Sequence, residues 1–161
     1  MRLPVALAIL LLSTPAYAAE SCNAWHASLD EDEGGPVMTA RVCSGTGDVV
    51  NELSFQCGAK GELMIRYIPV APENYPPAGD GNFETDLEFA LGQETFTTHA
   101  RYEDMDGAMA TEEIKIIPFL SALKKQKALD VADVKSKVPS ATFTLKGAKK
   151  ALEKLIATCE K

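Results

Sequence analysis

The chain has 161 residues, 46% of them hydrophobic, and a formal net charge of −7 at pH 7. The apolar content excludes a disordered chain, and the length suits one domain with its own core. The acidic balance argues against nucleic acid as a partner, because nucleic acid carries the same sign of charge.

The first 18 residues have the layout of a secretory signal peptide. Arg2 precedes an apolar run from Leu3 to Leu12, and Ala16-Tyr17-Ala18 matches a small-x-small cleavage site. The apolar run is too short to span a bilayer. We therefore expect export to the periplasm, cleavage after Ala18, and one β-rich domain over residues 19–161 that has no membrane span.

The four cysteines all lie in the predicted mature chain, where an even number indicates disulfides. Residues 25–32 and 37–44 flank the turn-like stretch EGGP and predict a hairpin. This hairpin would bring Cys22 and Cys43 to the same end of its ladder, which leaves Cys57 and Cys159 for each other. Of the three possible pairings we predict Cys22–Cys43 and Cys57–Cys159.

Alternating apolar residues predict half-buried antiparallel strands. The alternating sets are Leu53/Phe55/Cys57, Leu63/Ile65/Tyr67, Leu87/Phe89/Leu91, Phe96/Ala100/Tyr102 and Ala141/Phe143/Leu145. Gly92-Gln93 suits a two-residue hairpin turn that sets Phe89 against Phe96. A three-residue loop with a bulge at Gly61 is expected to place Phe55 opposite Leu63.

Two segments have helical spacing. PFLSALKKQKAL begins at Pro118, a residue favoured in a first turn, and carries apolar residues on one side. In residues 147–161 one apolar stripe ends at Cys159, and the lysines lie on the outer face. The expected fold class is β-rich α+β: an antiparallel β-sandwich or barrel-like sheet with a C-terminal helix, a second short helix and disulfides.

Charge is divided unevenly along the chain. Residues 19–114 hold 19 acidic and 4 basic residues, whereas residues 115–161 hold 11 basic and 4 acidic residues. Either the two segments present surfaces to different partners, or the basic segment packs on the acidic one and reduces its self-repulsion. We favour the second interpretation.

No stretch predicts a metal, a cofactor or a catalytic centre. The acidic stretches at residues 30–33, 80–82 and 104–107 depart from the calcium-loop spacing and are interpreted as polar turns. Neither Cys-x-x-Cys nor paired histidines are present. The two histidines, His26 and His99, accompany no Gly-x-Ser-x-Gly motif. The protein is therefore expected not to be an enzyme. Trp25, on the first predicted strand, is expected to lie in the core rather than to bind a ligand.

Two contact surfaces are predicted. The segment Pro72–Phe83, rich in proline and glycine, is expected to form an exposed loop that presents Tyr75, since loops on a rigid scaffold often carry binding. The outer face of the C-terminal helix presents Lys149, Lys150 and Lys154 as the second surface.

Three stretches carry a family resemblance. ELSFQCGAKGELMIRY pairs a cysteine-ended strand with an apolar strand, IPFLSALKKQKALDV gives a helix and a strand, and ATFTLKGAKKALEKLIATC gives strand, glycine, helix and cysteine. In this order they resemble the exported TagO/VasI-type proteins, accessory to type VI secretion. They are also similar to the invasion-associated locus B group. The resemblance covers Glu52 to Cys159 and implies a compact β-rich periplasmic domain with a C-terminal helix.

The sequence predicts a non-enzymatic periplasmic accessory or binding protein of the cell envelope, with a secretion system as one setting and another envelope protein as partner. A second hypothesis is an acidic inhibitor of a cationic envelope hydrolase such as lysozyme. A third is a small-ligand carrier with an apolar pocket between sheet and helices.

Overall fold

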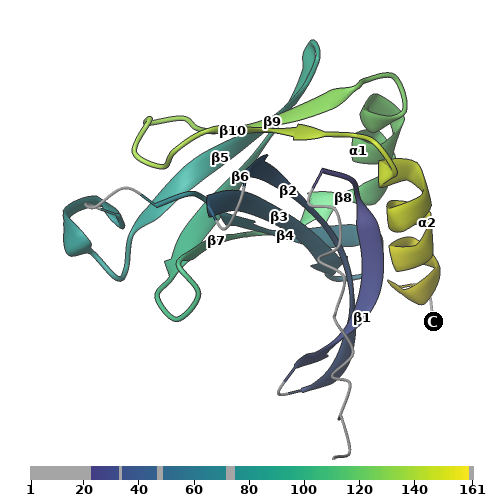
Figure 1. Ribbon diagram of the computed structural model, residues 1–161, viewed down its shortest axis with the longest axis horizontal. Coiled ribbons are helices and arrows are strands. Elements are labelled where there is room, and N and C mark those ends of the chain that lie inside the picture. The colour runs from purple at the N-terminus through teal and green to yellow at the C-terminus, as the bar shows by residue number, and fades with distance from the viewer. Residues whose placement is uncertain (1–22, 33, 47–48, 72–74, 160–161) are drawn as a thin grey trace, which may run out of the picture.

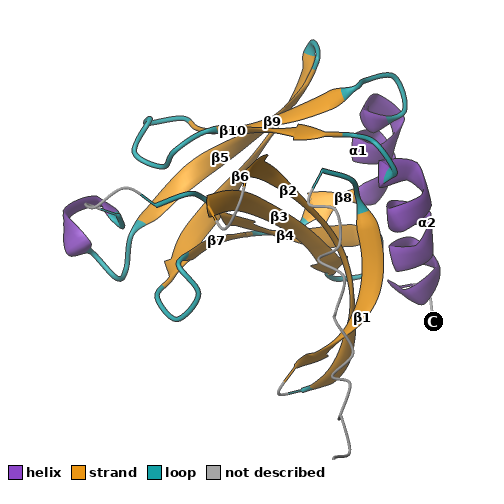
Figure 2. Ribbon diagram, viewed as in Figure 1, coloured by secondary structure: helices purple, strands orange, loops and turns teal. Residues whose placement is uncertain are grey.

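The computed structural model describes residues 23–32, 34–46, 49–71 and 75–159. The predicted signal peptide lies outside the described residues. Within them the chain forms one curled antiparallel sheet and two α-helices, which lie together at one end of the sheet (Figure 1, Figure 2). Neither helix of this part of the chain has the length and apolar character needed to cross a membrane.

The strands follow one another along the chain with short connections. They are β1 (His26–Asp32), β2 (Gly35–Thr46), β3 (Val49–Cys57), β4 (Glu62–Ile68), β5 (Glu84–Leu91), β6 (Glu94–Glu103), β7 (Ala108–Thr111), β8 (Ile114–Lys115), β9 (Ala128–Asp133) and β10 (Ala141–Thr144). The helices are α1 (Ile116–Leu123) and α2 (Ala148–Cys159), and a short 3-10 helix, η1, spans Pro77–Gly79.

The sheet has the order β1-β2-β3-β4-β7-β6-β5-β9-β10, and β8 pairs with β4. It curls until β10 packs against β2. Trp25 joins the two ends of the curl, since its backbone N–H and its indole Nε1 donate hydrogen bonds to the carbonyls of Lys146 and Thr144 at 2.9 and 2.7 Å. The predicted β-rich fold is confirmed, and the barrel-like sheet is the arrangement observed.

The inner face of the curl is the hydrophobic core. Period-two alternation sends every second residue of a strand to this face, as predicted. The fully buried inward residues include Leu53, Phe55, Leu63, Ile65, Tyr67, Leu87, Phe89, Leu91, Leu129, Val131 and Phe143. Trp25 is also buried, so its expected place in the core is confirmed. The outward residues of the same strands are mostly polar, with Met64 and Val49 among the exposed apolar exceptions.

The hairpin predictions are confirmed with one correction. Phe89 pairs with Phe96 across a two-residue turn that starts at Gly92, whose φ is 68°. Four residues, 58–61, separate β3 from β4. The Gly58 N–H donates to the Glu62 carbonyl, so the three residues 59–61 lie inside the closing hydrogen bond, and the last of them, Gly61, has φ 84°. However, Phe55 faces Ile65 rather than Leu63. A two-residue shift in register keeps every side chain on its face, so alternation alone does not separate the two registers.

Helix α1 connects two distant parts of the sheet. It starts at Ile116, two residues before the predicted start, so that Pro118 still lies in its first turn. The buried ring of Phe119 makes edge-on contacts with Phe55 of β3 and Phe96 of β6, with ring centroids 5.5 and 5.3 Å apart. The helix ends at Leu123, earlier than predicted, because i→i−3 hydrogen bonds tighten the chain there.

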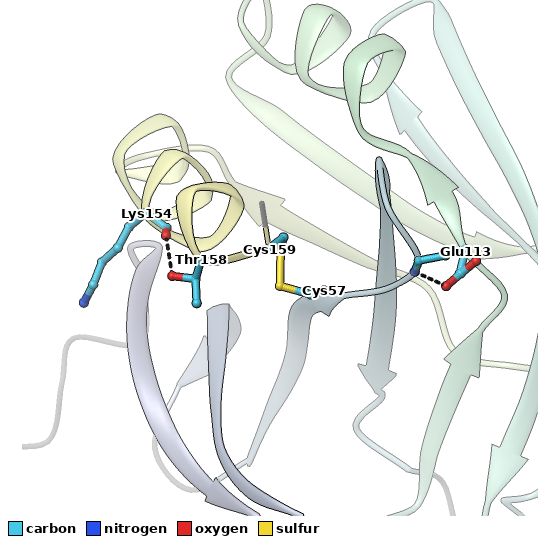
Figure 3. The surroundings of a disulfide bond; sticks show 6 residues. Cys57, Glu113, Lys154, Thr158 and Cys159 are labelled. Atoms are coloured by element: carbon cyan, nitrogen blue, oxygen red, sulfur yellow. Dashed lines mark hydrogen bonds between the residues drawn. A yellow bond between two sulfur atoms is a disulfide. The ribbon is translucent and has the colours of Figure 1, made fainter. Parts of the chain in front are cut away.

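Helix α2 packs on β1, β2 and β3 through the predicted apolar stripe. Its approach requires glycine at position 147, where φ is 81° and a Cβ would lie 2.8 Å from the Trp25 carbonyl oxygen. The predicted Cys57–Cys159 disulfide is confirmed, with the two Cα atoms 5.4 Å apart. It joins the end of α2 to the end of β3 (Figure 3). The predicted Cys22–Cys43 pair includes Cys22, which lies outside the described residues.

A buried carboxylate organises the turn between β9 and β10. Asp133 is 5% exposed and accepts hydrogen bonds from the Thr85 hydroxyl and from the backbone N–H groups of Lys135, Lys137 and Val138. Burial alone would raise the pKa of this carboxyl, but the four hydrogen bonds stabilise its charged form and bring the pKa below its usual value.

The Asp133 carboxylate therefore gives the fold a pH-dependent stability. Because its folded pKa is lower than its unfolded pKa of about 4, the contribution is complete above about pH 4 and is lost as the pH falls toward the folded pKa. Asp133→Ala should lower the free energy of unfolding at pH 7 by about 2–3 kcal/mol, since it leaves buried donors unpaired. Urea unfolding from pH 7 to pH 2 would measure this, and an equal acid-induced loss in wild type and variant would contradict it.

Candidate functional site

An acidic groove crosses the outer face of strands β4, β7, β6 and β5. Its volume is about 710 Å³. The residues that line it are Glu62, Met64, Glu84, His99, Arg101, Glu103, Ala110, Thr111, Glu112 and Glu113. Five of these ten residues are glutamates, against a single arginine. We refer to this surface as the acidic groove.

The groove exists because β7 presents small side chains between strands that present long ones. Ala110 faces outward and is paired with Arg66 of β4 on one side and with Arg101 of β6 on the other. Its methyl group leaves a hollow that Arg101 and the glutamates of the neighbouring strands border. Since Ala110 is only 6% exposed, the floor of the groove is closed.

A β-bulge places two of the glutamates. Arg66 pairs with Ala110 while Leu63 pairs with Ile114, so the three residues Thr111–Glu113 lie opposite the two residues Met64 and Ile65. The Thr111 hydroxyl accepts a hydrogen bond from the backbone N–H of Ile65, 3.1 Å away, next to this interruption of the ladder. Bulges redirect side chains, and here the result is that two adjacent glutamates both line the groove.

The groove keeps an excess of negative charge after its ion pairs are counted. Glu103 pairs with Arg66, with 2.7 Å between the carboxylate and guanidinium, and Glu62 pairs with Lys115. Glu113 accepts a hydrogen bond from the backbone of Ala59, at the loop between β3 and β4. No ion pair in the described part of the chain involves the exposed carboxylate of Glu112.

His99 lies at one wall of the groove between two carboxylates. Its Nε2 is 3.5 Å from Glu84 and its Nδ1 is 3.3 Å from Asp86, and 42% of the side chain is exposed. The outward position agrees with the parity of the strand. The residues that line the groove beside this histidine include Thr111 and no serine or cysteine.

The groove continues toward α1. A second hollow of about 580 Å³ shares His99, Glu112 and Glu113 with it and reaches Pro118 along the outer residues of β6. The two hollows therefore adjoin each other on the outer face of the sheet.

The predicted role of Tyr75 as an exposed contact needs correction. Its ring packs edge-on against Tyr102, with centroids 5.4 Å apart, and belongs to the residues packed against the core. Burial raises the pKa of its hydroxyl, and the nearby Tyr102 raises it further. Proline and glycine content predicts a loop but not which of its side chains turns inward. Tyr75 is half-buried and helps to anchor this loop, and its role in binding stays a prediction.

The three predicted lysines lie on the exposed side of α2, as expected. Lys149 is 3.9 Å from Glu153 one turn further along, whereas Lys150 and Lys154 line a small recess between α2 and β1. Among the described ion pairs, Lys115–Glu62 is the one that joins the basic segment to the acidic segment. The α2 lysines are exposed, while α2 itself packs on β1, β2 and β3 of the acidic segment. The basic segment therefore does pack on the acidic one, and a separate partner for the lysines stays a prediction.

The acidic turns do not gather further ligands. Within the described residues no group of three or more His, Cys, Asp or Glu side chains has the arrangement of a metal site. Asp80 instead accepts a hydrogen bond from the backbone of Asn82, and Asp106 contacts Arg66. Glu33, at the end of the first acidic stretch, lies outside the described residues.

Sequence reasoning did not identify the acidic groove. Glu62, Glu84, Glu103 and the pair Glu112–Glu113 are far apart in the chain and meet only through the strand order. One local signal was available: two adjacent glutamates between the apolar residues of MATEEIKI break the alternation, which indicates a bulge.

Comparison of the chain with protein-family models, with curated proteins and with solved structures found no match in any of the three.

Proposed function

We propose that this is a non-enzymatic exported binding protein of the cell envelope, and that its acidic groove binds a basic surface of another protein. The observation that carries the proposal is the groove itself, with five glutamates around a closed alanine floor. The groove lies on the outer face of the sheet, which leaves the core intact when a partner binds.

Charge complementarity supports a basic partner. A surface of one sign attracts the opposite sign over a Debye length and raises the association rate, and added salt weakens this effect. The acidic segment of the chain, with 19 acidic against 4 basic residues, extends the field beyond the groove. Arg101 is the exception within the groove, since it would lie against the positive charges of such a partner.

Charge reversal in the groove should abolish capture of the partner. Glu84→Lys with Glu112→Lys changes two exposed side chains that line the groove. We expect this variant to lose a partner of basic isoelectric point that the wild-type protein retains from the periplasm of its own host. The measurement is affinity capture at about 50 mM and about 500 mM salt, read by mass spectrometry, with less capture at the higher salt.

The matched control is Glu31→Lys with Asp80→Lys, which makes the same charge change at two exposed residues outside the groove. This control should keep the partner, and Arg101→Gln should retain more of it than the wild type does. If both charge-reversal variants lost the partner equally, the loss would depend on net charge alone, and this result would contradict a role for the groove.

The resemblance to TagO/VasI-type proteins favours a secretion-system setting for this binding, with another envelope protein as the partner. If the captured protein is a component of such a system, the accessory role is supported. If the captured protein is basic but belongs to no secretion system, this result would support binding at the groove and contradict the secretion role.

A second candidate function is inhibition of a cationic envelope hydrolase such as lysozyme, because an acidic groove complements the surface of a basic enzyme. Lysozyme assays at low and moderate salt test it directly, and an absence of inhibition in both would remove it. The carrier hypothesis is not favoured, because Phe119 fills the space between the sheet and α1 where an apolar pocket was expected.

A further inference from the structure

A second recess lies between α2 and the start of β1, formed by a set of residues separate from the acidic groove. Its volume is about 290 Å³. The residues that line it are Trp25, His26, Ala27, Gly147, Lys150, Ala151 and Lys154. We call it the basic recess, since these residues include two lysines and a histidine and no acidic side chain.

The lysines are placed by the packing of the helix on the strand. Gly147 brings the start of α2 into contact with the backbone of Trp25, which sets the width of the recess. The ammonium group of Lys154 donates a hydrogen bond to the Ala27 carbonyl, 2.9 Å away, and so bridges from the helix to the strand. Lys154 extends from α2 on the side away from the disulfide (Figure 3).

Within the described ion pairs, no acidic side chain of α2 pairs with Lys150 or Lys154. The first turn of α2 contains no acidic residue, and instead contains Lys149 and Lys150. Positive side chains oppose the partial positive charge at the start of a helix, so this order is locally unfavourable. Among the described ion pairs, Glu153 of the same helix pairs with Lys149 and not with Lys150. Departures from local rules of this kind are concentrated at functional sites.

We propose that the basic recess binds a phosphate group, held between Lys150 and Lys154. The recess has room for a headgroup-sized ligand, and lysine is a common ligand of phosphate, which it binds as a point charge. Two sources carry this chemistry in an envelope compartment: the headgroup of an anionic phospholipid, and a free phosphomonoester. The proposal is independent of the function of the acidic groove, because the two sites share no lining residue.

The chain carries its own reporter for this site. Trp25 is the single tryptophan of the protein and lines the recess, so we expect its fluorescence to change when the recess is occupied. The full mature chain would be titrated with glycerol phosphate, with phosphatidylglycerol vesicles and with phosphatidylcholine vesicles. The fluorescence of Trp25 would be recorded in each titration, and vesicle binding would also be measured by flotation.

The test variant is Lys150→Gln with Lys154→Gln, and the matched control is Lys135→Gln with Lys137→Gln. The control lysines are exposed in the turn between β9 and β10, outside the recess, and give the same change in net charge. We expect the affinity for the phosphate-bearing probe to fall by about tenfold or more in the test variant and to stay unchanged in the control. Lys150→Gln alone, which keeps the Lys154 contact with β1, should show a smaller loss.

Each outcome decides the proposal. Binding to phosphatidylglycerol but not phosphatidylcholine vesicles, lost only in the test variant, supports a lipid headgroup. A saturable response to glycerol phosphate without vesicle flotation supports a free phosphomonoester. Equal weakening in test and control variants, or no response to either phosphate-bearing probe, would overturn the proposal.

Discussion

Removal of the Cys57–Cys159 disulfide is expected to lower the free energy of unfolding by about 4–5 kcal/mol, the chain-entropy value for a loop of this size. The two cysteines are 102 residues apart, so the bond closes a loop that contains most of the sheet and both helices. The variant Cys57→Ser with Cys159→Ser should also lose hydrogen-exchange protection in the last turn of α2, since Cys159 is its final residue. Urea unfolding and amide exchange measure the two effects.

A control for this effect is Thr158→Ala, which changes an exposed side chain next to the disulfide in the same helix turn. It should alter the free energy of unfolding by no more than about 0.5 kcal/mol. If the double serine variant were as stable as this control, the disulfide would not be what secures α2 to the sheet.

Truncation of Phe119 is expected to cost about 3–5 kcal/mol, the usual range for a phenylalanine-to-alanine change in a core. Its ring is fully buried and contacts Phe55 of β3 and Phe96 of β6, which belong to opposite parts of the curled sheet. Phe119→Ala therefore opens a cavity where three aromatic rings meet. Chemical denaturation with a two-state fit provides the measurement.

The matched control comes from the same helix. Ile117 is 82% exposed, so Ile117→Ala should change the free energy of unfolding by no more than about 0.5 kcal/mol. Similar values for Phe119→Ala and Ile117→Ala would contradict the view that α1 joins the two parts of the sheet through this ring.

Local patterns predicted the elements of this fold well, because each depends on neighbours in sequence. The alternation of Leu87, Phe89 and Leu91 and the apolar stripe of α2 both matched the buried faces observed. Gly92 and Gly61 marked the two turns, since their positive φ values suit glycine. The Cys57–Cys159 pair followed once the hairpin had been predicted.

Features that depend on contacts between distant residues were not predicted. The register of β3 against β4 was wrong by two residues because both registers bury the same side chains. Tyr75 was expected to be exposed, yet it packs on Tyr102, which lies in a strand that the local sequence does not connect with this loop. The acidic groove likewise required the order β4-β7-β6-β5, which places Ala110 between longer side chains.

The most direct test of the proposed function is site-specific photo-cross-linking in the periplasm of the host. A photoreactive residue at Met64, which lines the acidic groove, would be compared with one at Val49, which is 62% exposed and outside it. The proposal predicts a cross-link to one basic protein from Met64 and not from Val49, lost when Glu84→Lys and Glu112→Lys are added. The same products from both positions, or a Met64 product that survives the charge reversal, would contradict binding at the groove.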